Sequence, residues 1–205
     1  ATMNGNNANR IYGKGELTVL PTGMAIFGNQ ASVSGITDLL VYDGGVLTVD
    51  GGTLHIDDQL HIYDGGTLNM PDGELWVHKF GYGTSLSSYN PANFYVEAGV
   101  QGGISGGTVR ICGRTSPYGL YSMTIMEPAF NFSGIATVKF EHGTYGTHYD
   151  ASINTVNGVT IGNLVIDKPG NTVFVSGDLS VPGSLDVQPN STLEVEDGNT
   201  LTIGP

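Results

Sequence analysis

Aromatic and imidazole side chains recur along this chain at a spacing of 21 residues. Tyr63 follows Tyr42 by 21 positions, and Trp76 follows His55 by the same number. Tyr and Trp rings offer flat faces on which the C–H face of a sugar can pack. Stacking that merely stabilises a sheet is the simpler explanation of such ladders. The ligand-binding candidates on these ladders are Tyr42, Tyr63, His61, His55 and Trp76.

Two carboxylates share this spacing, because Asp43 and Asp64 each precede a Gly-Gly pair 21 residues apart. Carboxylates stacked in register offer oxygen ligands to Ca²⁺, which prefers such hard donors. Asp before Gly-Gly is also ordinary turn chemistry, since its side chain bonds the backbone amides that follow. Asp43 and Asp64 are therefore the metal candidates, turn formation is the simpler explanation for both, and no other cofactor is expected.

A carboxylate doublet, Asp57-Asp58, has the residue types that a glycoside hydrolase uses to protonate a leaving oxygen and activate water. It falls in the expected turn between Ile56 and Leu60. The chain lacks the ordered Gly-His-Gly and Arg-Ile-Lys segments of pectin-cleaving β-helix hydrolases. We therefore assign no catalytic residue, and keep a polysaccharide lyase or glycoside hydrolase only as the alternative.

Short Leu-x-apolar units must position these side chains. The units Leu39–Val41, Leu47–Val49 and Leu54–Ile56 all reappear 21 residues later in the same order. Each unit is a minimal strand with alternating faces, and Asp-Gly turns separate the units. A meander of hairpins would use the same turns but predicts no three-unit period. The pattern predicts an all-β, single-stranded parallel β-helix (β-solenoid) with three short strands per coil of about 21 residues.

The repeat also predicts how the chain is organised. We expect one domain over 1–205, with regular coils in 15–79, coils with irregular loop excursions in 80–132 and regular coils again in 133–205. In the last part the expected strand partners are Leu164 with Leu185, Val173 with Leu193, and Leu179 with Leu201. The last unit lacks a capping element, which predicts a fragment of a longer protein with adjacent domains.

Aromatic residues gather in the irregular middle, over the excursions 81–92 and 112–133. Loops inserted into a rigid repeat often carry its function. Tyr118 and Tyr121 are therefore further ligand-binding candidates. The alternative is that aromatics such as Phe130 and Phe132 pack against the repeat as a satellite core. Exposure around a groove would favour carbohydrate binding, and burial would favour packing.

Composition narrows the class of protein. The 205 residues include 32 Gly and carry a formal net charge of −12, which disfavours a nucleic-acid partner. Cys112 is the one cysteine, so no intrachain disulfide forms. No apolar run is long enough to span a membrane. The first residues do not form a signal peptide, so either a signal was removed or this is a piece of a longer chain.

The segment 133–205 resembles the repetitive β-solenoid regions of large secreted bacterial surface proteins, particularly substrates of type IX secretion. The matching motifs lie in 135–140, 159–168, 175–185 and 198–203, with a weaker echo in 15–79. The resemblance implies an extracellular, secreted or cell-surface location and an adhesive or scaffolding role. It implies no catalytic residues.

The expected function is therefore a non-catalytic structural or adhesive module of a secreted or cell-surface bacterial protein. Its expected partners are polysaccharide or other cell-surface and matrix components. The alternative is a carbohydrate-active β-helix that binds or cleaves a polysaccharide through the aromatic loops at 80–132.

Overall fold

The structure is a computed structural model that describes residues 2–3, 9–28, 38–77, 92–112, 121–143, 149–156 and 158–204. This described part is all-β, with no helix among its elements. It accordingly contains no helix that is long and apolar enough to cross a membrane.

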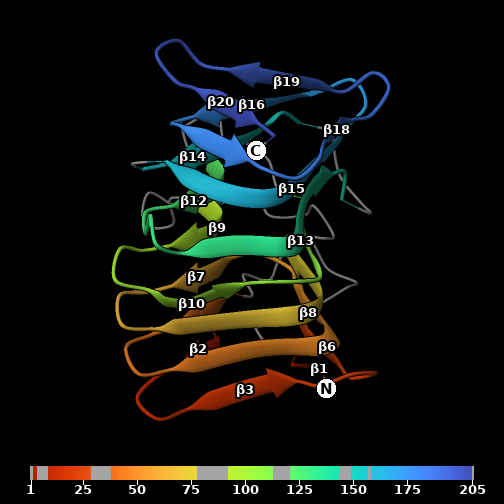
Figure 1. The fold of residues 1–205 in the computed structure, drawn as a ribbon. Helices are drawn as coiled ribbons and strands as arrows, with labels where there is room; N and C mark the ends of the chain where they lie inside the picture. The colour runs from red at the N-terminus through yellow and green to blue at the C-terminus, as the bar shows by residue number, and fades with distance from the viewer. Residues whose placement is uncertain are drawn as a thin grey trace.

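Two long sheets run the length of the molecule, and their strands pair in parallel. Figure 1 shows the strands stacked along one axis, from the red N-terminal end to the blue C-terminal end. The twelve-stranded sheet contains β1 (Thr2–Met3), β3 (Glu16–Val19), β4 (Met24–Phe27), β6 (Val46–Ile56), β8 (Thr67–Val77), β10 (Gln101–Ile104), β11 (Thr108–Ile111), β13 (Asn131–Glu141), β15 (Val159–Asp167), β17 (Leu179–Val181), β18 (Leu185–Val187) and β20 (Leu201–Ile203). The eight-stranded sheet contains β2 (Asn9–Ile11), β5 (Leu39–Val41), β7 (Leu60–Ile62), β9 (Ala92–Val96), β12 (Tyr121–Ile125), β14 (Ala151–Thr155), β16 (Thr172–Ser176) and β19 (Thr192–Val195).

Strand partners in the first half lie far apart in sequence. Leu39 pairs with Leu60, Leu47 with Leu68 and Leu54 with Leu75, so each residue pairs with its counterpart one repeat later. The last two pairs both join β6 to β8, because each of these strands runs through two of the expected units. A hairpin meander would instead pair consecutive units antiparallel. The parallel register therefore excludes the meander for this part of the chain.

The C-terminal pairs match the sequence expectation as well. Leu164 pairs with Leu185, Val173 with Leu193, and Leu179 with Leu201. Residues on these paired strands that point inward, such as Leu164 and Val173, are fully buried. The slightly variable spacing of the C-terminal units is therefore compatible with one continuous stack of parallel strands.

The middle of the chain differs from the expectation. Leu75 pairs with Val109 and Leu60 with Phe94, so paired residues here are 34 rather than 21 positions apart in sequence. The excursion expected over 112–133 is wrong for its second part, because β12 pairs in parallel with β9 and β14. A polar sequence such as Tyr-Ser-Met-Thr-Ile hides this strand, since only its alternate residues reach the core.

The hydrophobic core runs along the axis of the stacked strands. Aromatic rings from the middle of the chain, where the sequence predicted loop excursions, form part of it. Phe94 and Phe132 are fully buried, and Phe130 is 1 % exposed. Phe132 meets both rings edge to face, with centroid distances of 6.5 Å to Phe94 and 5.3 Å to Phe130. Burying each ring stabilises the fold by roughly 1.5–3 kcal/mol. The packing alternative is thus correct for Phe130 and Phe132.

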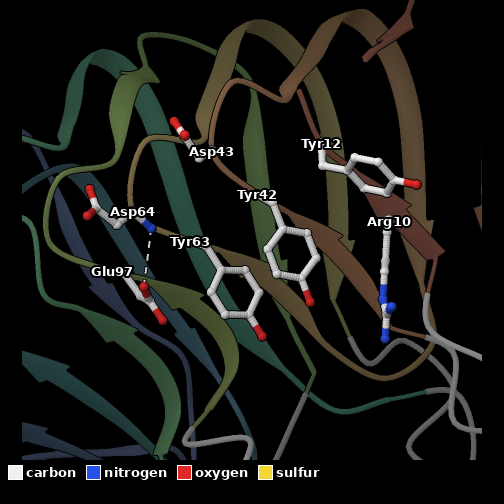
Figure 2. A pocket seen from close by; sticks show the side chains of 7 residues that line it. All are labelled: Arg10, Tyr12, Tyr42, Asp43, Tyr63, Asp64 and Glu97. Carbon is white, nitrogen blue, oxygen red and sulfur yellow. Dashed lines mark hydrogen bonds between the residues drawn. The ribbon is translucent and has the colours of Figure 1, made fainter. Parts of the chain in front are cut away.

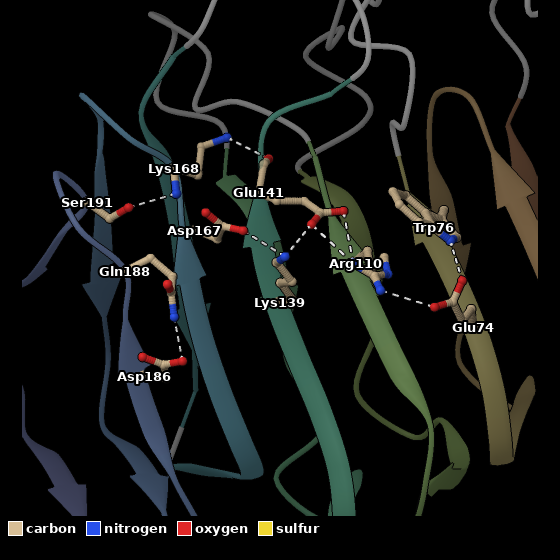
Figure 3. Close-up of polar contacts among 10 residues, drawn as sticks. All are labelled: Glu74, Trp76, Arg110, Lys139, Glu141, Asp167, Lys168, Asp186, Gln188 and Ser191. Carbon is tan, nitrogen blue, oxygen red and sulfur yellow. Dashed lines mark hydrogen bonds and ion pairs between the residues drawn. The ribbon is translucent and has the colours of Figure 1, made fainter.

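An ion-pair ladder crosses the outer face of the larger sheet (Figure 3). Arg110 on β11 lies 3.1 Å from a Glu74 oxygen on β8 and 3.2 Å from a Glu141 oxygen on β13. Lys139 continues the ladder, with its Nζ 2.8 Å from Glu141 and 2.7 Å from Asp167 on β15. Opposite charges therefore alternate across four neighbouring strands, where they support the parallel register.

Candidate functional site

A shallow groove of about 740 Å³ lies on the smaller sheet, where strands β2, β5, β7 and β9 lead into their turns. Its lining residues are Arg10, Tyr12, Tyr42, Asp43, Tyr63, Asp64 and Glu97 (Figure 2). Backbone hydrogen bonds between neighbouring strands hold Tyr42 and Tyr63 in line at the centre of the groove. Tyr42 N–H donates to Ile11 O and Tyr63 N–H to Val41 O, both at 2.8 Å. The parallel pairing of successive strands thus assembles the groove from residues distant in sequence.

The two tyrosines at the centre of the groove stack as the sequence predicts. The rings of Tyr42 and Tyr63 have centroids 4.3 Å apart and planes 8° apart. Tyr63 also stacks on the imidazole of His61, with ring centroids 3.7 Å apart and planes 15° apart. Tyr63 is thereby stacked against two rings. Burial, followed by its hydrogen bond with Tyr42, raises the pKa of Tyr63 to about 12, which keeps the hydroxyl neutral.

His61 is buried, at 3 % exposed, although its outward position predicted an exposed ring. Its Nε2 lies 2.9 Å from Glu97 Oε1, and the ring of Tyr95 meets it edge-on at 4.6 Å. Burial lowers the pKa of His61 despite the opposing effect of Glu97. Glu97 Oε2 also accepts a bond from the Asp64 N–H at 3.2 Å. His61 therefore supports the tyrosine stack from behind rather than lining the groove.

Arg10 and Tyr12 line the part of the groove next to Tyr42. Figure 2 shows both side chains beyond Tyr42, on the side away from Tyr63. Tyr12 is 67 % exposed, and Tyr42 is only partly buried. A sugar ring entering here would find a tyrosine face, a guanidinium that donates hydrogen bonds, and carboxylates that accept them. This arrangement suits binding of a polar, ring-containing ligand.

His55 and Trp76 form a second pair, but they lie on β6 and β8 of the larger sheet, apart from the groove. His55 is 5 % exposed, and its ring meets Trp76 edge-on at 5.6 Å and 67° rather than flat. The Arg110 guanidinium lies 4.5 Å from the Trp76 ring centroid, and the indole Nε1 donates to Glu74 at 3.0 Å. These contacts tie Trp76 into the ion-pair ladder.

The remaining candidates are the carboxylates Asp43 and Asp64 and the tyrosines Tyr118 and Tyr121. Asp43 and Asp64 are exposed on the turns at the rim of the groove. In the described ranges, no group of three or more His, Cys, Asp or Glu side chains is arranged to hold a metal ion. Tyr118 lies outside the described residues. Tyr121 begins β12, and the structure describes its backbone but not its side chain.

A buried polar row, which the sequence reasoning missed, lies beside the groove on the same sheet. Its members are Asp38, Gln59, Asn93, Ser122 and Ser152, all 6 % exposed or less. Each directly precedes an inward-facing apolar residue of a strand in the smaller sheet, so its side chain points away from the core. A polar residue recurring before each such apolar residue is the signal that could have revealed the row.

Two carboxyl groups have raised pKa values here, that of Asp38 in the row and that of Asp58, which directly precedes Gln59. Burial raises the pKa of Asp38 to about 6. Burial, and then repulsion from Asp38 and Asp57, raises the pKa of Asp58 to about 7. Asp57-Asp58 lies in the connection between β6 and β7, as the sequence predicted. Asp58 is 8 % exposed, so its carboxyl group is poorly placed to reach a polymeric substrate.

Comparisons of the chain with protein-family models, with curated proteins and with solved structures find no match.

Proposed function

We propose that this chain is a β-solenoid with three short strands per coil of about 21 residues, and that it serves as a structural or adhesive module of a secreted or cell-surface protein. The observation that carries the proposal is the parallel register, in which Leu39, Leu47 and Leu54 each pair with the residue 21 positions later. A stack of coils is quasi-one-dimensional, because each coil contacts only its neighbours. Such a stack makes a stiff, extended support for display at a surface.

A second function, carbohydrate binding, is favoured by the groove of Tyr12, Tyr42 and Arg10. Its support is a partly exposed tyrosine face with a guanidinium and carboxylates beside it. The site differs from the aromatic loops that the sequence suggested, because Phe130 and Phe132 are buried in the core. Adhesion to a polysaccharide through this groove would unite the two functions in one module.

Glycan-array binding of the wild-type chain, Tyr42→Ala and Tyr149→Ala tests the groove. Removing the Tyr42 ring should weaken binding about 5-fold or more, since a stacked aromatic contributes on the order of 1 kcal/mol or more. Tyr149 is the matched control, because it is 41 % exposed and lies just before β14, three strands along the same sheet from β7. Equal loss in both variants, or no glycan bound by the wild type, would refute carbohydrate binding at the groove.

A reducing-sugar assay on the bound glycans separates a binding module from an enzyme. The proposal predicts no release of reducing ends, whatever the incubation time. Release that persists in Asp57→Asn and Asp58→Asn variants would place catalysis elsewhere, and release lost in them would place it at that doublet. Either result would contradict the non-catalytic module.

A further inference from the structure

Three buried oxygens on neighbouring strands have no hydrogen-bond partner within the described part of the chain. They are Asp38 Oδ1, Gln59 Oε1 and Asn93 Oδ1. Their residues are 6 %, 0 % and 1 % exposed, respectively. A buried acceptor left without a donor costs stability, and native proteins rarely leave several of them together. A ligand that satisfies all three at once would explain the group.

The sheet places these oxygens side by side. Leu39 pairs with Leu60 and Leu60 with Phe94, so the residues before them occupy one row on the outward face. The Leu39 N–H donates to Gln59 O at 2.8 Å, which fixes the first two members. The Gln59 side-chain nitrogen donates to Ala92 O at 2.5 Å. The amide nitrogen is therefore committed, and the amide oxygen of Gln59 is left to accept.

Negative charge accumulates at the same place. Asp58 precedes Gln59, is 8 % exposed, and is close enough to Asp38 for the two carboxyl groups to repel each other. None of the ion pairs formed within the described ranges involves either group. Buried carboxyl groups without a counter-charge either take up a proton or bind a cation. A cation can be bound by the two carboxylates and by the unpartnered amide oxygens together.

We propose that Asp38, Asp58, Gln59 and Asn93 form a Ca²⁺ site between successive coils. Gln59 lies at the start of β7, the middle one of three successive strands, with Asp38 and Asn93 at the strands about 4.8 Å to either side, so an ion bound at the Gln59 oxygen is within reach of side chains that lean in from both neighbours. Ca²⁺ accepts such ligands because it takes roughly six to eight oxygens in flexible geometry. Half of the ligands are amide oxygens, which Ca²⁺ accepts readily. Mg²⁺ is a poorer fit, because it retains its waters and demands strict octahedral geometry.

The site is distinct from Asp43 and Asp64, which are exposed at the groove rim. Two double variants, each of which removes two carboxylates, can therefore distinguish the buried site from the groove rim. Asp38→Asn with Asp58→Asn keeps the shapes of the buried side chains and removes the charges that attract the ion. Asp43→Asn with Asp64→Asn removes exposed carboxylates and serves as the matched control.

Thermal unfolding in EDTA, in millimolar CaCl₂ and in millimolar MgCl₂ tests the site, with calorimetric titration of CaCl₂ on the folded protein. Ca²⁺ should raise the unfolding temperature of the wild type by about 3 °C or more, and Mg²⁺ by less. The Asp38/Asp58 variant should lose this Ca²⁺ shift while unfolding in EDTA at or above the wild-type temperature, because no buried charge remains. The Asp43/Asp64 variant should keep the shift.

Three results would overturn the assignment. The first is a wild-type chain whose unfolding temperature and calorimetric titration are indifferent to Ca²⁺. The second is a Ca²⁺ shift that survives in the Asp38/Asp58 variant. The third is a shift that disappears in the Asp43/Asp64 control, which would move the ion to the groove rim. An Asn93→Ala variant adds an uncharged check, and its Ca²⁺ affinity should fall at least ~10-fold.

Discussion

Phe94 and Phe132 meet edge to face in the core, with ring centroids 6.5 Å apart, although they belong to different sheets, on β9 and β13. Both are fully buried. Truncating such a ring leaves a cavity that its neighbours fill only in part. We predict that Phe132→Ala lowers the free energy of unfolding by about 3–5 kcal/mol in denaturant titrations.

Ile135 on the same strand as Phe132 provides the control for this core prediction. It is 78 % exposed, so Ile135→Ala should change the free energy of unfolding by no more than about 0.5 kcal/mol. Equal effects of the two substitutions would show that Phe132 does not lie in the core.

Gly73 tests how closely the paired strands β6 and β8 approach each other. Gly73 and Gly198 both have positive φ, at 104° and 83°, so an added side chain strains the backbone at either position. A Cβ on Gly73 would collide with Gly52 O on β6, whereas one on Gly198 meets nothing within 4 Å. We predict that Gly73→Ala costs about 3 kcal/mol or more and Gly198→Ala about 1 kcal/mol. Equal costs in thermal unfolding would mean that β6 and β8 are not in such close contact at Gly73.

The ion-pair ladder should contribute modestly to stability and respond to salt. Arg110 bonds Glu74 and Glu141 and covers Trp76, with its side chain 22 % exposed. A double-mutant cycle of Arg110→Met and Glu141→Gln should give a coupling energy of about 1 kcal/mol at low ionic strength. The coupling should shrink in molar salt, since screening weakens partly exposed pairs. If no coupling were found at any ionic strength, the ion-pair ladder would not contribute to holding the strand register.

Lys168 predicts how stability changes at alkaline pH. It is 2 % exposed, its Nζ donates to Glu141 O at 3.1 Å, and burial lowers its pKa to about 8. Below pH 8 the folded chain bears the full cost of a buried charge. As the pH rises from about 8 to 10, the folded chain releases this proton while the unfolded chain retains it, so stability increases.

The Lys168→Met variant isolates this contribution. Its free energy of unfolding, relative to wild type, should fall by about 2 kcal/mol between about pH 8 and pH 10. Chemical denaturation at several pH values measures the difference, and the other titrating groups cancel in the comparison. A difference that stays constant with pH would mean that the Lys168 amine is not buried in its charged form.

The sequence predicted the parts of the fold in which the repeat is regular. Pairs such as Leu39 with Leu60 could be predicted because identical turn chemistry follows both strands. The strand β12 could not, because its pairing with β9 departs from the regular spacing and its polar residues hide the alternation. Extra residues between β8 and β9 likewise increase the sequence separation between the paired residues of β7 and β9. Nothing in the sequence near β9 indicates which residue of β7 each of its residues will pair with.

The candidate site was predicted in part for the same reason. The stack of Tyr42 on Tyr63 follows directly from the repeat, and the structure has it. The roles of Arg10 and Tyr12 were not foreseen, because β2 pairs with β5 at an offset longer than the regular repeat. Nor was the burial of His61, Gln59 and Asn93, since an outward-facing position on a strand ordinarily predicts exposure to solvent.

Cysteine cross-linking tests the stacked-coil register most directly. Thr48 and Asn69 are paired across β6 and β8, one repeat apart, and both lie between inward-facing residues. The variant Thr48→Cys with Asn69→Cys should form a disulfide on mild oxidation, detected by peptide mass spectrometry. Thr48→Cys with Thr67→Cys is the control, because a displacement of about two residues along the strand puts the Cα atoms about 8 Å apart, too far to bridge. Efficient bridging of 48 to 69 but not 48 to 67 is the predicted result, and failure of the first pair, or equal bridging of both, would contradict the solenoid.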